Sequence, residues 1–183
     1  MALGAVLVLA ALIGGFVLLT GGDDEDDGGG GSATEASELT ERLTERELGI
    51  SAFYPEDWKR TERNGIVTLE SKDRCAAVSL SSPVPANLTS SLLNDSVASA
   101  RRSFGKKAIF GREDRPAPVG DRPTQAAVAA VPGKGGTPVA VRLVASRGEQ
   151  LGHLVQQVIR NPEACTRSGA QARAVVESIV YTR

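Results

Sequence analysis

The feature that most constrains this chain is an uncharged apolar run near its N-terminus, from Ala2 to Leu19. In a bilayer the backbone polar groups must bond to one another, so such a run is expected to be helical. At 1.5 Å per residue, about 18 residues span roughly 27 Å, close to the hydrocarbon thickness of a membrane. Residues 1–20 are therefore predicted to form a transmembrane signal-anchor helix.

Two other interpretations of this run were weighed. A buried core helix is rarely apolar on every face. A cleaved signal peptide usually has a shorter apolar core, and no small-x-small cleavage site follows this one. We favour an uncleaved anchor. No Lys or Arg precedes the run, the first being Arg42. The distribution of basic residues therefore says little about orientation, and it leaves open a start upstream of Met1.

The next segment, residues 21–36, reads GGDDEDDGGGGSATEA and is predicted to be a disordered tether. As a flexible coil of about 16 residues it reaches roughly 20–25 Å. Its acidic cluster lacks the preformed cage that calcium requires. Residues 37–48 are predicted to form a short helix, because Leu39 and Leu43 are one turn apart and Ser37 is a suitable N-cap. The alternative is that this segment belongs to the tether.

The two cysteines, Cys75 and Cys165, are far apart in the sequence. Such a pair is typical of one structural disulfide formed in an oxidising space, the alternative being two unrelated buried thiols. Two cysteines and the single histidine, His153, are too few ligands for a structural zinc site. No metal or cofactor is predicted. The cysteines and the anchor together predict a single-pass protein of the cell membrane with its soluble domain outside the cytoplasm.

Residues 49–183 are predicted to form the globular domain. Three close-spaced strands are expected to pair as an antiparallel meander, and a pair of long strands to form a later hairpin. An amphipathic helix lies between them and another closes the chain, which gives an α+β domain. The predicted strands are 50–54, 65–70, 75–80, 108–110, 125–131, 138–146 and 150–160, and the predicted helices are 89–104 and 168–181.

The segment Ile50-Ser51-Ala52-Phe53-Tyr54-Pro55-Glu56-Asp57-Trp58 resembles the strand–Pro–x–x–Trp start of PsbP-like domains. The order of the later hairpin, Val139–Arg160, and of the closing helix, Ala170–Ile179, is similar as well. The resemblance implies an α/β/α sandwich around a mostly antiparallel sheet. It also implies a secreted or membrane-anchored protein that binds protein partners and is not an enzyme. No set of functional residues can be carried over from that family.

Candidate site residues are few. His153 could act as a base with Ser146 and Glu149, which lie across the predicted turn, but a structural histidine is the commoner case. Tyr54 and Trp58 are the aromatic side chains best suited to a binding surface, the alternative being that they anchor the core. The formal net charge of −1 gives no reason to expect nucleic acid as a partner.

Three functions follow from these observations. The first is a membrane-tethered extracytoplasmic, non-catalytic domain that binds a protein partner or supports an envelope complex. The second is a module that binds a lipid or another small apolar ligand between the sheet and a helix. The third is an uncharacterised hydrolase that uses Ser146, Glu149 and His153.

The anchor prediction is tested by membrane fractionation. The full-length chain is expected to stay in the membrane pellet through washes with plain buffer and with high salt, because an apolar helix does not partition into water. The same chain lacking residues 1–20 should appear in the soluble fraction. Release of the full-length chain by buffer alone would contradict the prediction.

Overall fold

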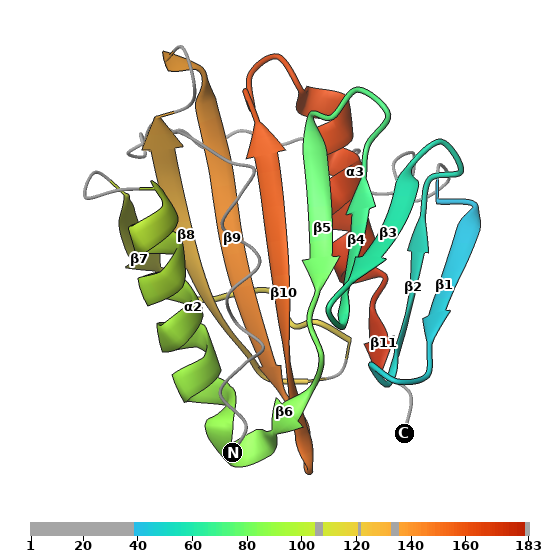
Figure 1. Cartoon of the computed structure of the whole chain (residues 1–183), viewed down its shortest axis with the longest axis vertical. Helices are drawn as coiled ribbons and strands as arrows, with labels where there is room; N and C mark the ends of the chain where they lie inside the picture. Colours follow the sequence, from blue (N-terminus) through green and yellow to red (C-terminus); the bar gives the residue numbers. More distant parts are fainter. Residues whose placement is uncertain (1–38, 105–107, 121, 133–135, 182–183) are drawn as a thin grey trace, which may run out of the picture.

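The computed structural model describes residues 39–104, 108–120, 122–132 and 136–181 (Figure 1). The predicted anchor, 1–20, and tether, 21–36, lie outside the described residues. The elements in chain order are β1 (Glu41–Glu45), β2 (Ile50–Tyr54), β3 (Lys59–Arg63), β4 (Ile66–Glu70), β5 (Ala76–Leu80), β6 (Val84–Pro85), the short 3-10 helix η1 (Ala86–Leu88), α2 (Thr89–Phe104), β7 (Ile109–Arg112), β8 (Thr124–Pro132), β9 (Pro138–Arg147), β10 (Leu151–Arg160), α3 (Thr166–Glu177) and β11 (Val180–Tyr181).

A large antiparallel sheet forms the centre of the domain. Its strands lie in the order β3-β4-β5-β10-β9-β8-β7, and the short β6 also pairs with β10. The predicted hairpin of two long strands is confirmed, with β9 and β10 in register from Gly152 opposite Arg147 to Arg160 opposite Val139. These central strands are buried on both faces, and they read accordingly as nearly continuous apolar runs rather than as strict alternation.

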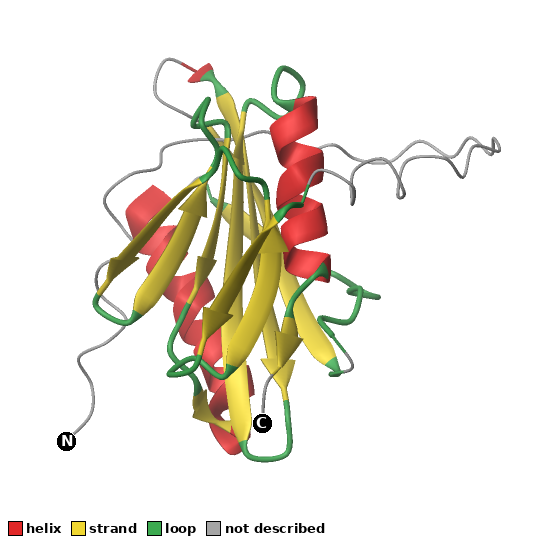
Figure 2. Cartoon of the chain, turned by 90° about the vertical axis from the view of Figure 1, so that its right-hand side faces the viewer, coloured by secondary structure: helices red, strands yellow, loops and turns green. Residues whose placement is uncertain are grey.

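The two helices cover opposite faces of this sheet (Figure 2). Helix α2 packs on β8, β9 and β10, where Leu93 meets a core that includes Leu143 and Leu154. Helix α3 packs on β5 and β10, where Val175 shares a second core with Val144. Side chains that alternate along β9 therefore enter different cores, as the pleat of a strand requires. The predicted α+β class and the α/β/α layering are confirmed.

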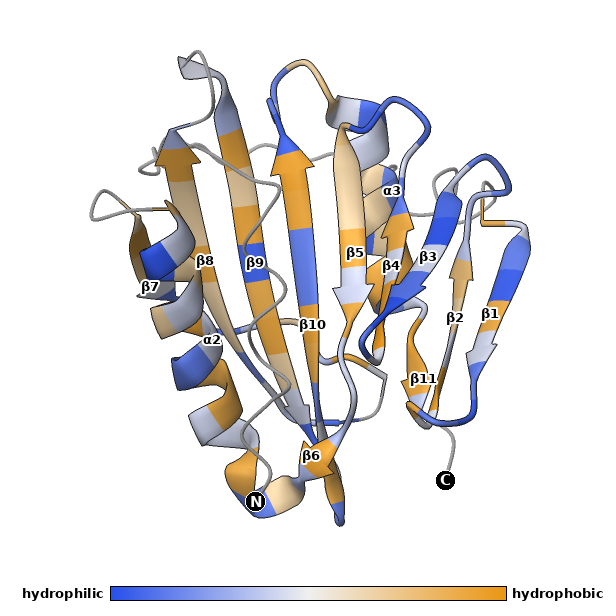
Figure 3. Cartoon of the chain, viewed as in Figure 1, coloured by the Kyte–Doolittle hydropathy of each residue, from blue (hydrophilic) through white to orange (hydrophobic). Residues whose placement is uncertain are grey.

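The edge strand β3 is the most polar strand of the sheet, and its residues are all exposed (Figure 3). Charged side chains on an edge discourage pairing with another chain. The strand joins β4 through Asn64 and Gly65, which both have positive φ, at 53° and 71°. This is the turn chemistry that the Asn-Gly dipeptide predicts for a tight hairpin.

The short helix predicted over 37–48 is wrong in the part that the structure describes. Strand β1 occupies Glu41–Glu45 and pairs with β2, with Leu43 opposite Ala52. Leu43 is 3% exposed and its neighbours are open to solvent, so the apolar spacing of this segment serves a half-buried strand. Pairing with the next strand, β2, outweighed the weak helical preference.

The predicted meander of three strands is also corrected. Strand β2 does not pair with β4; it joins β1 and β11 in a separate three-stranded sheet. The meander consists instead of β3, β4 and β5, and the charged strand β3 had not been predicted. The closing helix ends at Glu177, and Val180 and Tyr181 leave it to pair with β2.

Cys75 and Cys165 form a disulfide, with their Cα atoms 5.7 Å apart, as the sequence predicted. The bond joins the residue before β5 to the residue before α3. It therefore fastens the helix to the large sheet and closes a loop with a sequence separation of 90 residues.

Removal of this disulfide should destabilise the domain. The double variant Cys75→Ala/Cys165→Ala is expected to lose up to about 4.5 kcal/mol of unfolding free energy in the chain-entropy account. At about 2–4 °C per kcal/mol, its melting temperature should fall by roughly 10–15 °C. Reducing agent should lower the melting temperature of the wild type and leave the double variant unchanged. Equal melting of both proteins under oxidising conditions would contradict this role.

Candidate functional site

An open cleft of about 730 Å³ lies at the turn between β9 and β10. Its walls come from segments that are distant in the sequence: the residue before β2, the stretch before β8, the hairpin turn and the last strand. The lining residues are Gly49, Arg122, Pro123, Arg147, Gly148, Glu149, Gln150, Leu151, His153 and Tyr181. It is larger than the other hollows described below, so we regard it as the candidate site.

Arg122 is held in this cleft by stacking. Its guanidinium carbon lies 3.9 Å from the centre of the Tyr181 ring, within cation–π range. Gly148, in the hairpin turn, also packs against the guanidinium. A Cβ at this position would lie 2.6 Å from Nη1 and 2.7 Å from Cζ. Glycine is therefore required at position 148 if the guanidinium is to keep this place.

His153 ties the two sheets together at the cleft. Its Nε2 lies 2.8 Å from the backbone oxygen of Leu48, just before β2. Because a carbonyl can only accept, Nε2 carries the proton, and in the neutral ring Nδ1 is left as an acceptor. Nδ1 is shielded from solvent and has no hydrogen-bond partner among the described residues. The ring also packs on Tyr181, with 4.8 Å between ring centres.

These surroundings keep His153 neutral. Burial lowers the pKa of the ring, the hydrogen bond to Leu48 opposes this, and the positive charge of Arg122 lowers the pKa further. A neutral ring beside a cation is a stable arrangement, whereas a second positive charge at this position would be repelled.

The hydrolase hypothesis is not supported by the contacts of its three residues. Ser146 and His153 lie opposite each other in the β9–β10 register, so the structure does bring them together. However, the Ser146 hydroxyl is hydrogen-bonded to the Tyr181 hydroxyl, and Nε2 of His153 is bonded to Leu48. Glu149 lies at the exposed turn. Among the described contacts there is no Ser–His or His–Glu hydrogen bond, so no nucleophile is coupled to a base.

Trp58 lies in the core of the domain. It is 5% exposed, and its indole N–H donates to Oε1 of Gln171 on α3 at 3.3 Å. Of the two interpretations of this residue, the core anchor is the one that its burial favours. Tyr54 is half-buried and packs against the same core, and its part in a binding surface stays a prediction.

The space between α2 and the sheet leaves no room for an apolar ligand. The hollow there, between Phe104, Leu154 and Gln156, has a volume of about 40 Å³. This is enough for a water molecule or two and far below the size of a ligand site. The hollow described on the α2 side is therefore too small for the second predicted function.

A third hollow, of about 240 Å³, lies beside the disulfide around Asp73. Burial raises the pKa of this carboxyl, but hydrogen bonds from Ser71, the Cys75 N–H and Ser168 outweigh burial and lower it overall. The Ser71 and Ser168 hydroxyls lie 2.6 and 2.7 Å from the carboxylate oxygens. Asp73 therefore joins the start of β5 to the first turn of α3, which is a structural role.

Clusters of metal ligands and membrane-spanning helices are both absent from the part of the chain that the structure describes. Within the described residues, no three His, Cys, Asp or Glu side chains gather closely enough to hold a metal ion. No helix in the same ranges is both long enough and apolar enough to cross a membrane.

Sequence reasoning found His153, Ser146 and Glu149 but missed Arg122, Gly148 and Tyr181. The missed residues belong to separate segments, and nothing in their local sequence distinguishes them. Tyr181 had been assigned to the end of the closing helix, which would point its ring elsewhere. The one available signal was the rarity of aromatic residues, at 4% of the chain.

The chain's sequence matches no known protein-family model and no curated protein. Its structure is similar to that of a protein from Bacteroides thetaiotaomicron solved at 1.50 Å, with a TM-score of 0.50 and 12% identity. The match covers 79% of this chain and 49% of that one, so this chain spans about half the length of the Bacteroides protein. At this identity the likeness concerns the fold alone.

Two other solved structures are similar. One is the solution structure of cyanobacterial PsbP (CyanoP) from Synechocystis sp. PCC 6803. That match has a TM-score of 0.48 and 10% identity, and it covers 86% of this chain and 98% of that one. LpqN, described as involved in cell envelope biogenesis of Mycobacterium tuberculosis, matches with a TM-score of 0.41 and 14% identity over 73% of this chain and 83% of its own.

The neutral state of His153 predicts a pH dependence of stability. The ring has a lowered pKa in the folded state and an ordinary value of about 6.5 when unfolded, so the unfolded chain binds the proton more readily. The free energy of unfolding should therefore be level above about pH 6.5 and fall as the pH drops below that value. Urea unfolding between pH 5 and pH 8 measures this. Because His153 is the single histidine, His153→Gln should remove this part of the slope; equal slopes would contradict the assignment.

Proposed function

We propose that this chain is a non-catalytic binding domain, tethered to the membrane and facing an extracytoplasmic space, that engages a protein partner. The observation that carries the binding role is the open cleft at the β9–β10 turn. Its polar side chains are held by stacking and by structural hydrogen bonds rather than arranged as a catalytic set. Binding residues are commonly carried on loops that a rigid scaffold positions, as this turn is by the two longest strands.

The extracytoplasmic location is supported by the disulfide. Cys75 and Cys165 are paired across two separate elements, and such bonds persist in oxidising compartments and are rare in the cytosol. The tether is supported by the apolar run of residues 2–19 and by the acidic Gly/Ser-rich segment that follows it. Together these features describe a domain that is displayed a short distance from the membrane surface.

The partner is sought by site-specific photo-crosslinking in intact cells of the native host. A photoreactive amino acid replaces Gln150, which is exposed at the rim of the cleft. The matched control replaces Asp95, which is exposed on α2, on the opposite side of the large sheet. Crosslinks to a discrete protein band are expected at position 150 and not at position 95.

Equal or absent crosslinking at the two positions under several growth conditions would contradict the proposed partner. Location is tested in the same cells by trapping free thiols before lysis. Cys75 and Cys165 should be unreactive because they are oxidised, and a freely reactive pair would contradict the extracytoplasmic assignment.

A further inference from the structure

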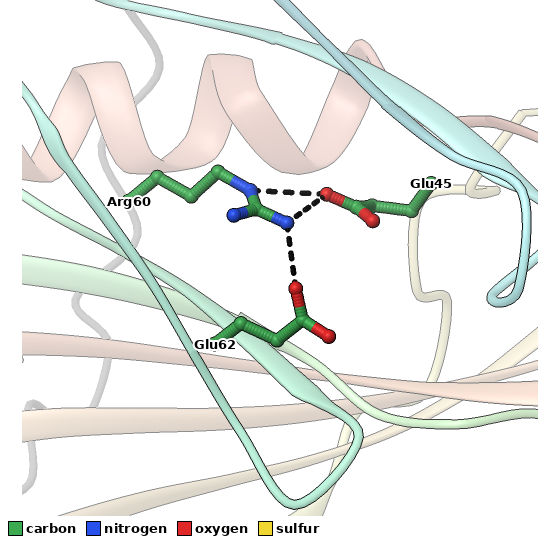
Figure 4. Close-up of polar contacts among 3 residues, drawn as sticks. All are labelled: Glu45, Arg60 and Glu62. Atoms are coloured by element: carbon green, nitrogen blue, oxygen red, sulfur yellow. Dashed lines mark hydrogen bonds and ion pairs between the residues drawn. The ribbon is translucent and has the colours of Figure 1, made fainter.

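The arginines of this domain differ in what they are bonded to. Arg60, on the charged edge strand, is 36% exposed, yet it contacts two carboxylates (Figure 4). Its Nε lies 3.0 Å from Glu45, and its Nη2 lies 2.9 Å from Glu62. Arg142 is likewise held by both oxygens of Glu113, at 2.9 and 3.1 Å. In both cases a carboxylate pairs with a guanidinium that water could also solvate.

Arg122 is less exposed than Arg60 and has no such carboxylate among the residues that the structure describes. It is half-buried in the cleft, and none of the ion pairs or side-chain hydrogen bonds among the described residues involves it. Its Nη1 is shielded from solvent without any hydrogen-bond partner in the described structure. A shielded donor that stays unpaired is costly, and a shielded charge more so. Arg122 is therefore a partly buried cation whose charge no carboxylate among the described residues balances, and a ligand that carries an anionic acceptor would balance it.

The surroundings of Arg122 restrict where that acceptor can bind. The Tyr181 ring covers the guanidinium, and Gly148 abuts Cζ and Nη1. Gly148 also lies against Nε, which a Cβ at this position would approach to 3.1 Å, so a ligand must reach the guanidinium from the open side of the cleft. Two parallel N–H groups on one edge match the two oxygens of a carboxylate. A phosphate would leave further charged oxygens that need donors of their own.

The charge of the cleft agrees with this assignment. Its ionisable lining, apart from the neutral His153, consists of Arg122, Arg147 and Glu149, with one net positive charge. We propose that the cleft binds the carboxylate of a small organic acid or acidic group through the guanidinium of Arg122. Tyr181 and Gly148 position the guanidinium for this contact, and His153 keeps Tyr181 in place. The Ser146–Tyr181 hydrogen bond supports the ring from the β9 side.

The test is a binding titration of the purified full-length chain in a mild detergent and a carboxylate-free buffer. The probes are succinate, its uncharged diamide succinamide, and inorganic phosphate, followed by NMR shift changes or calorimetry. Succinate is expected to bind saturably and succinamide not. Arg122→Gln should weaken succinate binding by about tenfold or more, the equivalent of about 1.4 kcal/mol. Arg122→Lys should bind succinate more tightly than Arg122→Gln but more weakly than the wild type, because an ammonium cannot donate two parallel N–H bonds to a carboxylate.

Matched variants separate this contact from general effects of charge and of folding. Arg60→Gln removes a guanidinium that is already paired with carboxylates and that lies outside the cleft. This variant should bind succinate with an affinity within about twofold of the wild type. Gly148→Ala keeps every charge and displaces the guanidinium, so it should weaken binding as Arg122→Gln does. Melting temperatures of all variants are recorded, and Gly148→Ala and Arg122→Lys decide the question if Arg122→Gln does not fold.

Two results would overturn the inference. One is succinate binding that is absent, or that is unchanged in both Arg122→Gln and Gly148→Ala. The other is Arg122-dependent binding in which phosphate is preferred to succinate. The inference does not rest on the proposed protein partner, because it is measured on the isolated chain. If crosslinking in cells fails, the carboxylate-binding inference still stands. If succinate does not bind, the crosslinking result for the protein partner still stands.

Discussion

The pairing of β9 with β10 is the interaction on which the rest of the domain depends. These two strands are the longest in the structure, and they lie side by side at the centre of the large sheet. Because successive side chains point to opposite faces, Leu143 enters the core under α2 and Val144 enters the core under α3. A slip of one residue would exchange the two cores, so both helices hold this register in place.

The smaller sheet depends on the larger one at a few defined points. His153 bonds to the backbone oxygen of Leu48, two residues before β2, and Trp58 bonds to α3 through Gln171. The Ser178 hydroxyl accepts from the Phe53 N–H at 2.9 Å, which joins the end of α3 to β2. Three strands of two to five residues would be marginal alone, so they are stable because their inner face is buried against α3 and the large sheet. The candidate cleft lies where this attachment meets the β9–β10 turn.

The position of the cleft explains why its residues combine structural and binding properties. His153, Ser146 and Tyr181 are engaged in holding β11 against the large sheet. Arg122 is stacked on the same ring, yet it has no carboxylate among the described residues. A ligand that bonds to Arg122 would therefore contact a residue that is coupled through Tyr181 to the packing of the two sheets. Binding and the stability of the C-terminal strand are expected to be linked at this point.

The sequence by itself determined the elements whose signal is local. The stripe from Leu93 to Phe104 predicted α2, Asn64-Gly65 predicted a tight turn, and the apolar runs of β9 and β10 predicted the central hairpin. The cysteine pair and the α+β class followed in the same way. Each of these features follows from the pattern of neighbouring residues, or from the number of cysteines and of predicted elements. Both can be obtained from a single sequence.

Tertiary structure alone decided which strands pair over long distances and which side chains meet. The segment around Leu43 is a strand because Ala52 and its neighbours are available to pair with it, although its own spacing is equally suited to a helix. Tyr181 leaves the closing helix because β2 offers it an edge, and only then can its ring reach Arg122 and His153. Leu43 and Ala52 are nine residues apart, whereas Tyr181 lies 28 residues from His153, 59 from Arg122 and 131 from Ile50, so no single local pattern contains the free energy of these contacts.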